Sequence, residues 1–165
     1  MTLGGYDASR FIPNSIPFHF TGDISRDLVV GLQSITSKNS TGSSFSLLPS
    51  PILTFIDSTW PYIYLPYAAC QLFEQNLGLT WNPSVRLYTI NETLHQSLLA
   101  SNPNFTFTIA DSTHGGATVD LVLPYASFDL EATFPLVSNN TRYFPLKRAA
   151  NETQFTLGRT FLQEA

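Results

Sequence analysis

Residues 52–66 read ILTFIDSTWPYIYLP, and this is the most informative stretch of the chain. The apolar run over 52–56 predicts a buried strand, and Asp57 follows directly at its end. An unpaired buried charge is costly, so an apolar strand that ends on a carboxylate is uncommon unless the carboxylate has a role. Ser58 and Thr59 add two hydroxyl groups, and Pro66 stands at a position where a helix can begin.

The composition favours a single β-rich domain over residues 1–165. Aromatic residues make up 13% of the chain, and such residues favour strands. Charged residues make up only 12%, against about 25% in typical soluble domains. The net charge is −4 and the basic residues are scattered, which excludes nucleic acid as a partner.

Cys70 is the only cysteine, so no disulfide can form within the chain. Two interpretations remain open for it. It is either a small buried apolar side chain or a half-cystine whose partner lies on a segment outside this sequence.

Five Asn-x-Ser/Thr sequons in a chain rich in Ser, Thr and Asn favour passage through the secretory pathway, with an extracellular or cell-surface destination. No signal peptide is visible in residues 1–11, and no apolar stretch reaches the ~18 residues that span a bilayer. The chain is therefore either cytosolic or a piece of a longer secreted protein, and we favour the second. The candidate glycosylation sites are Asn39, Asn91, Asn104, Asn139 and Asn151.

Alternation of apolar and polar residues predicts most of the secondary structure. Strands are expected at 16–21, 28–36, 52–57, 105–110, 119–123, 143–146 and 154–157, with a bulge at Gly31 and a polar hairpin turn over 38–45. Helices are expected at 66–77, closed by Gly78, at 92–100, capped by Asn91, and from 161. We expect His95 to be solvated. The fold class is all-β, mainly antiparallel, with two or three short helices.

Four segments resemble the second, C-terminal lobe of fungal pepsin-like aspartic peptidases, in the family's order. They are TLGGYDASRF at 2–11, the loop at 52–66, TVDLVLPYASFDL at 118–130 and QFTLGRTFLQEA at 154–165. The resemblance implies a single pepsin-like lobe. It also implies that a second Asp-bearing lobe is absent from this chain.

The resemblance implies that Asp57 is a catalytic carboxylate, supported by Ser58 and Thr59. The alternative is a structural carboxylate that ties the loop to nearby amide groups. Leu157 and Gly158 would cross its loop in a psi-shaped arrangement, where glycine permits close backbone approach. Trp60, Tyr62 and Tyr64 would line a substrate cleft for peptide or protein. Core packing is the alternative for these three aromatic residues.

Two departures from the family pattern leave the activity open. Thr59 replaces a glycine, and Trp60 stands where active members carry a hydroxyl residue. Aspartic peptidases need two carboxylates that share one proton, so the chain alone is expected to be inactive unless two copies pair their Asp57 loops.

The alternative is a pseudoenzyme that binds peptide, carbohydrate or a protein partner. A half-molecule is also expected to self-associate through its exposed interface. No cofactor is implied. The three histidines lack zinc-ligand spacing, so no metal is expected.

Overall fold

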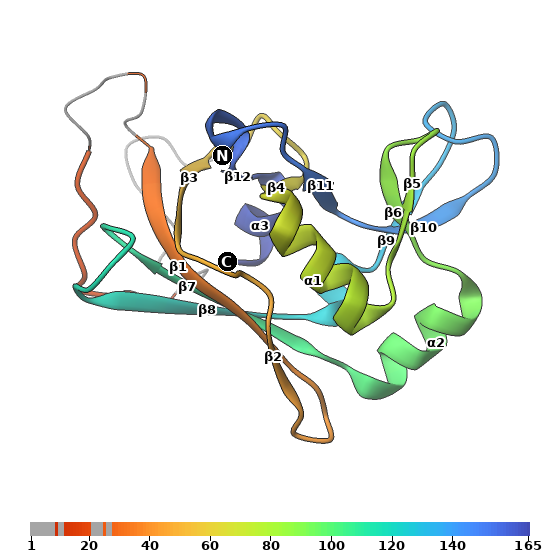
Figure 1. Ribbon diagram of the computed structural model, residues 1–165, viewed down its shortest axis with the longest axis horizontal. Helices are drawn as coiled ribbons and strands as arrows, with labels where there is room; N and C mark the ends of the chain where they lie inside the picture. The colour runs from red at the N-terminus through yellow and green to blue at the C-terminus, as the bar shows by residue number, and fades with distance from the viewer. Residues whose placement is uncertain (1–8, 10–11, 21–24, 26–27) are drawn as a thin grey trace.

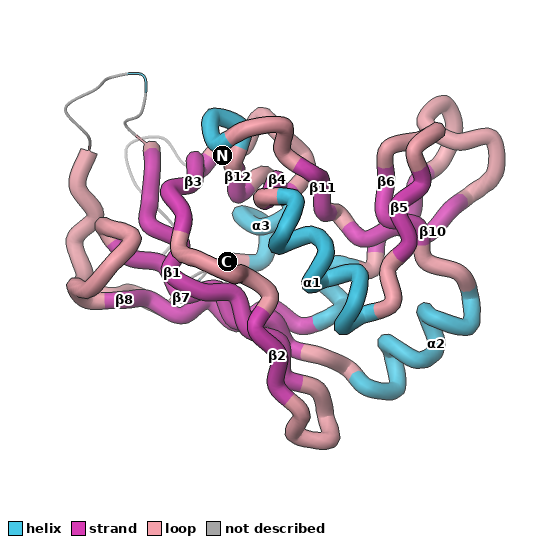
Figure 2. Tube along the Cα trace, in the orientation of Figure 1, coloured by secondary structure: helices cyan, strands magenta, loops and turns pink. Residues whose placement is uncertain are grey.

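A computed structural model describes residues 9, 12–20, 25 and 28–165 of the chain, and it shows two β-sheets with three short helices (Figures 1 and 2). The predicted fold class is confirmed, because eight of the ten strand pairings among the described residues are antiparallel. Apart from Ser9, the segment 2–11 lies outside the described residues. None of the helices in the described ranges is long and apolar enough to cross a membrane.

The larger sheet has the strand order β11-β4-β12-β3-β1-β7-β8, and β2 pairs with β1 at one side. Its strands are β1 Val29–Lys38, β2 Ser44–Ser46, β3 Ile52–Ile56, β4 Ile63–Leu65, β7 Asn104–Ala110, β8 Thr118–Pro124, β11 Leu146–Arg148 and β12 Thr156–Leu157. The smaller sheet runs β5-β6-β10-β9, formed by Thr80–Asn82, Leu87–Thr89, Thr141–Phe144 and Leu130–Ala132.

The helices begin and end where their capping residues indicate. Helix α1 (Tyr67–Leu77) starts after Pro66 and ends at Gly78, whose backbone is left-handed. Helix α2 (Glu92–Ser101) is capped by the Asn91 side chain, which accepts from the Leu94 N–H. Helix α3 (Arg159–Glu164) follows β12, and two 3-10 turns lie at Tyr125–Phe128 (η3) and Glu152–Gln154 (η4).

The core is built largely from phenylalanine. Phe73 of α1, Phe105 of β7, Phe128 of η3 and Phe144 of β10 are all buried. The Phe105 and Phe128 ring centroids lie 4.8 Å apart and those of Phe128 and Phe144 4.9 Å apart. Offset and edge-on aromatic packing of this kind adds to the burial of apolar area. Figure 1 shows α1 lying between the long strands and the smaller sheet, so these rings join the two sheets.

The predicted strand at 16–21 is wrong over residues 16–20, which form no strand. Pro17 has no N–H to donate to a ladder. The segment is instead held by Asp111, which accepts from the His19 N–H at 2.7 Å and contacts the His19 ring at 2.8 Å.

Gly31 is not the bulge. The register between β1 and β7 shifts between Leu32 and Ser34. A β-carbon on Gly31 would overlap the backbone of Ser112, so close backbone approach explains the glycine.

His95 is buried, contrary to the expectation that it is solvated. Its Nδ1 lies 3.3 Å from a carboxylate oxygen of Asp129 and 3.4 Å from the Tyr125 hydroxyl. A polar group can be buried when such partners replace water, and the helical pattern of α2 gave no sign of them.

Candidate active-site cleft

The loop after β3 holds its carboxylate by local hydrogen bonds. The Asp57 N–H donates to the Leu157 carbonyl at 3.2 Å. Oδ1 of Asp57 accepts from the Thr59 N–H at 2.8 Å and from the Thr59 hydroxyl at 2.6 Å. Among the described residues, positive φ outside glycine occurs only at Arg86 and Asn102. The backbone of Thr59 is therefore not in the left-handed region, so threonine in place of glycine causes no backbone strain here. The Thr59 hydroxyl orients the Asp57 carboxylate.

The two residues beside Thr59 point outward. Ser58 is exposed, and 51% of the Trp60 surface is accessible. The Trp60 ring packs edge-on against Tyr64, with ring centroids 5.4 Å apart. Tyr62 and Tyr64 form a second edge-on pair at 6.4 Å. The predicted aromatic residues are thus brought together beside Asp57.

A second segment crosses this loop at Gly158. Leu157 pairs with Ile56 in parallel and with Ile63 in antiparallel register. The Arg159 N–H donates to the Trp60 carbonyl at 2.7 Å, and the Thr160 hydroxyl donates to the Pro61 carbonyl at 2.6 Å. The crossing fixes the loop from 57 to 62 through backbone carbonyls. Sequence reasoning missed Thr160, although it stands two residues after the predicted crossing.

Strand register aligns one row of residues across four strands. Phe55 pairs with Thr156, Thr156 with Tyr64, and Tyr64 with Lys147. All four line the same cleft. The adjacent row faces the core, because side chains alternate between the faces of a sheet. That core row consists of Ile56, Leu157, Ile63 and Leu146.

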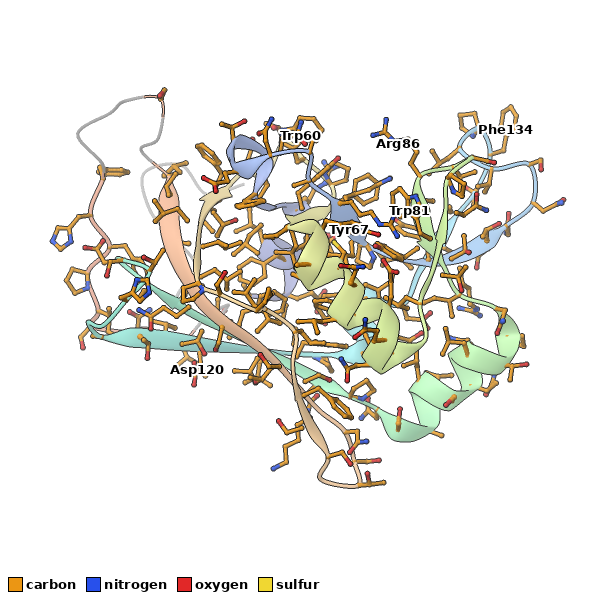
Figure 3. The ribbon with its side chains drawn as sticks, in the orientation of Figure 1. Trp60, Tyr67, Trp81, Arg86, Asp120 and Phe134 are labelled. Atoms are coloured by element: carbon orange, nitrogen blue, oxygen red, sulfur yellow. The ribbon has the colours of Figure 1, made fainter. Side chains whose placement is uncertain are left out.

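The cleft has a volume of about 760 Å³, and the row from Phe55 to Lys147 forms its floor. Asp57, Trp60 and Tyr62 line the same cleft beside this row. Trp81 and Arg86 line it from the β5–β6 hairpin. In Figure 3 the Arg86 side chain extends from this hairpin in the direction of Trp60.

Besides Asp57, the cleft is lined by the basic residues Arg86 and Lys147. Lys147 Nζ lies 4.4 Å from the centroid of the Tyr62 ring and donates to the backbone carbonyl of Arg86. Burial lowers the pKa of Lys147 to about 8, and the positive charge of Arg86 contributes. Burial also raises the pKa of Tyr64, with Tyr62 adding to the rise and Arg86 opposing it.

A third cation, Arg148, already has a partner. Its guanidinium lies 2.8 Å from a carboxylate oxygen of Glu74, and its Nε donates to the Tyr88 hydroxyl at 2.8 Å. The Tyr88 hydroxyl donates to the same Glu74 oxygen at 2.6 Å. This network ties β11 to α1 and β6, and we assign it a structural role.

Sequence reasoning missed Trp81, Arg86 and Lys147. The alternation around the buried Leu146 places Lys147 on the opposite face, which was an available signal. No local pattern indicates that the β5–β6 hairpin reaches the cleft. Among the described residues, no group of three His, Cys, Asp or Glu side chains is arranged to hold a metal ion.

The remaining predicted residues lie away from the cleft or at its rim. The candidate glycosylation residues occur in turns or at ends of elements, and all are exposed except Asn39, which is half-buried. Cys70 is a free, buried thiol on α1. Burial raises its pKa to about 12, as expected for an apolar packing residue.

The sequence matches no known family profile and no curated protein sequence. Its fold is similar to the crystal structure of the aspartic proteinase from Irpex lacteus, with a TM-score of 0.62 and 16% sequence identity. The chain has the pepsin-like fold. The alignment covers 97% of this chain and 45% of the Irpex lacteus chain, so this chain spans less than half the length of that protein. The layout of sheets and helices is that of a single pepsin-like lobe.

Proposed function

We propose that this chain is the C-terminal lobe of a fungal pepsin-like aspartic endopeptidase and that Asp57 is one of its two catalytic carboxylates. The observation that carries the proposal is the position of Asp57, held by Thr59 and placed in a cleft lined by Trp60 and Tyr62. The pepsin-like fold and the 45% coverage of the Irpex lacteus proteinase support a one-lobe assignment. The order of the four family-like segments supports the C-terminal lobe.

The chemistry requires a second carboxylate from the partner lobe. Two close carboxylates cannot both ionise easily, so they share one proton and together hold a water molecule. One carboxylate deprotonates the water while the other protonates the scissile carbonyl. Asp57 supplies one of these groups, so the 165-residue chain by itself is inactive in this proposal.

The test is acid peptidase activity of the chain expressed together with the coding sequence that precedes it. We expect cleavage of a protein substrate near pH 4 that pepstatin inhibits and that Asp57→Asn abolishes. Asp120→Asn is the matched control, because Asp120 is exposed on β8 outside the cleft. A folded two-lobe protein without pepstatin-sensitive cleavage contradicts the proposal. A preceding sequence without an Asp-bearing lobe contradicts it as well.

The second candidate function is a pseudoenzyme that binds peptide, carbohydrate or a protein partner in the same cleft. Trp60, exposed where active members carry a hydroxyl residue, favours it. In that case the parent is inactive, and Thr59→Gly combined with Trp60→Ser creates activity. An active parent contradicts the binding-only function.

The same proposal places the protein outside the cell or at its surface. The exposed sequons Asn91, Asn104, Asn139 and Asn151 suit N-glycosylation. The missing lobe and a peptide or protein substrate are the proposed partners. The isolated chain would self-associate through the surface that the second lobe covers. Loss of mass when the secreted protein is deglycosylated tests the glycosylation. Sedimentation of the isolated chain tests whether it self-associates.

A further inference from the structure

The ion pairs of the described residues leave two cleft cations without a carboxylate. The basic side chains that pair with acidic ones are His19, His95, Arg142 and Arg148. Arg86 and Lys147 line the cleft and are not among them. Two neighbouring cations in one cleft, with no carboxylate partner among the described residues, form a site to which an anion is attracted.

Arg86 and Lys147 are held close to each other. Lys147 Nζ donates to the Arg86 backbone carbonyl, and the Arg86 charge helps to lower the pKa of Lys147. The Lys147 ammonium also lies 6.0 Å from the Trp81 ring centroid, in addition to its contact with Tyr62. The aromatic rings restrict the Lys147 side chain, so less freedom remains to be lost when a ligand binds. A single carboxylate between the two cations would relieve their repulsion.

We propose that the cleft has a subsite for an acidic peptide side chain, formed by Arg86 and by Lys147, whose ammonium lies near the rings of Tyr62 and Trp81. This inference rests on the proposed function in so far as the ligand is a peptide. Arg148 does not belong to the subsite, because Glu74 already neutralises it.

Lys147, one of the two cations of the subsite, lies three strands away from Phe55. Phe55 and Lys147 occupy the same row, separated by β12 and β4. Neighbouring strands are about 4.8 Å apart, so the row spans about 14 Å. An extended peptide advances about 3.3 Å per residue, so a peptide that follows this row spans it with about four residues.

Intrinsic fluorescence of the 165-residue chain measures binding directly. Both tryptophans of the chain, Trp60 and Trp81, line the cleft. The probes are two capped pentapeptides, acetyl-Ala-Phe-Glu-Phe-Ala-amide and the same peptide with Gln in place of Glu. At pH 6.5 and low salt we expect the Glu peptide to bind about tenfold more tightly, since one charge-assisted contact is worth about that factor.

Lys147→Met and Arg86→Gln should each remove most of this preference while the Gln peptide binds as before. Lys38→Met is the matched control, because Lys38 is the only other lysine and is exposed at the end of β1. It removes the same charge, and the preference should persist. Circular dichroism and thermal melting establish that each variant is folded. If Lys147→Met does not fold, Arg86→Gln decides the outcome, because Arg86 is exposed on a turn.

Equal binding of the two peptides by the parent overturns the acidic subsite, and so does a preference that survives both cleft variants. The acidic subsite is also overturned if neither peptide binds. The proposed peptidase function and the acidic subsite can be rejected independently of each other. A Glu preference in a protein without pepstatin-sensitive cleavage keeps the subsite and rejects the enzyme, whereas cleavage without a Glu preference does the reverse.

Discussion

Gly158 and the backbone carbonyl of Tyr62 are packed so closely that a β-carbon on Gly158 would overlap the Tyr62 oxygen. The same β-carbon would overlap the carbonyl oxygen of Trp60. Backbone atoms cannot rotate away as a flexible side chain can. The contact therefore joins the start of α3 to the loop that carries Asp57, and it excludes every side chain at position 158.

Replacing Gly158 by alanine should destabilise the protein by about 2–4 kcal/mol, because overpacking against backbone forces strands to shift. Urea unfolding measures the change. Gly42→Ala is the control: Gly42 has open space around it but a φ of +88°, so only backbone strain of about 1 kcal/mol is expected. Equal losses in the two variants would show that the crossing is not tight.

The Thr59 hydroxyl should contribute to the stability of the Asp57 loop. Thr59→Val removes the 2.6 Å bond to Asp57 and keeps the β-branched shape. We expect a loss of about 0.5–1 kcal/mol, the usual contribution of one hydrogen bond. Thr59→Ser retains a hydroxyl and should lose less in the same urea titration. A smaller loss in Thr59→Val than in Thr59→Ser would show that shape rather than hydrogen bonding holds the loop.

Arg148 should be worth more to stability than a surface cation. Arg148→Met leaves Glu74 and the Tyr88 hydroxyl without their shared partner, with only about a quarter of the Arg148 and Glu74 side chains exposed. We expect a loss of about 2 kcal/mol by urea unfolding. Lys38→Met, on the exposed end of β1, should change stability by less than about 0.5 kcal/mol. Similar effects of the two substitutions would show that the network does not contribute to stability.

Cys70 should make stability fall at high pH. Burial raises the pKa of its thiol to about 12 in the folded chain, against 9.0 for a thiol that is not buried, as in the unfolded chain. The unfolded chain therefore loses this proton first, so the contribution of Cys70 is fully present below about pH 9 and declines as pH rises toward 12. Unfolding free energies of the parent and of Cys70→Ala, measured from pH 7 to 10.5, should converge above pH 9. A constant difference would mean that the thiol titrates alike in both states.

The elements that the sequence predicted are those with strong local patterns. The apolar run of β3, the alternation in β7 and β8, and the caps of α1 and α2 are all local features, and each element lies where it was expected. The short strands β4, β5, β6 and β9 have three residues each, too few to show a period. Residues 16–20 show the opposite failure. Pro17 has no N–H to donate, and none of the described strands pairs with this segment, so alternation alone does not make a strand.

His95 shows why burial is harder to predict than helix position. Asn91 and the helical pattern locate α2. The burial of His95 depends on Tyr125 and Asp129, which lie 30 or more residues away. Such partners are brought together only when the chain packs.

Local features of the sequence predicted that Asp57 follows a buried strand, whereas the close approach at Gly158 was implied by the resemblance to pepsin-like lobes. The strand follows from its apolar run, which is a property of the local chain. Only the tertiary structure decided that Lys147 lies in register with Tyr64 and that Arg86 reaches the cleft from the β5–β6 hairpin. Pairing between distant strands is fixed by packing of the whole core, so the charge of the cleft is a property of the folded chain.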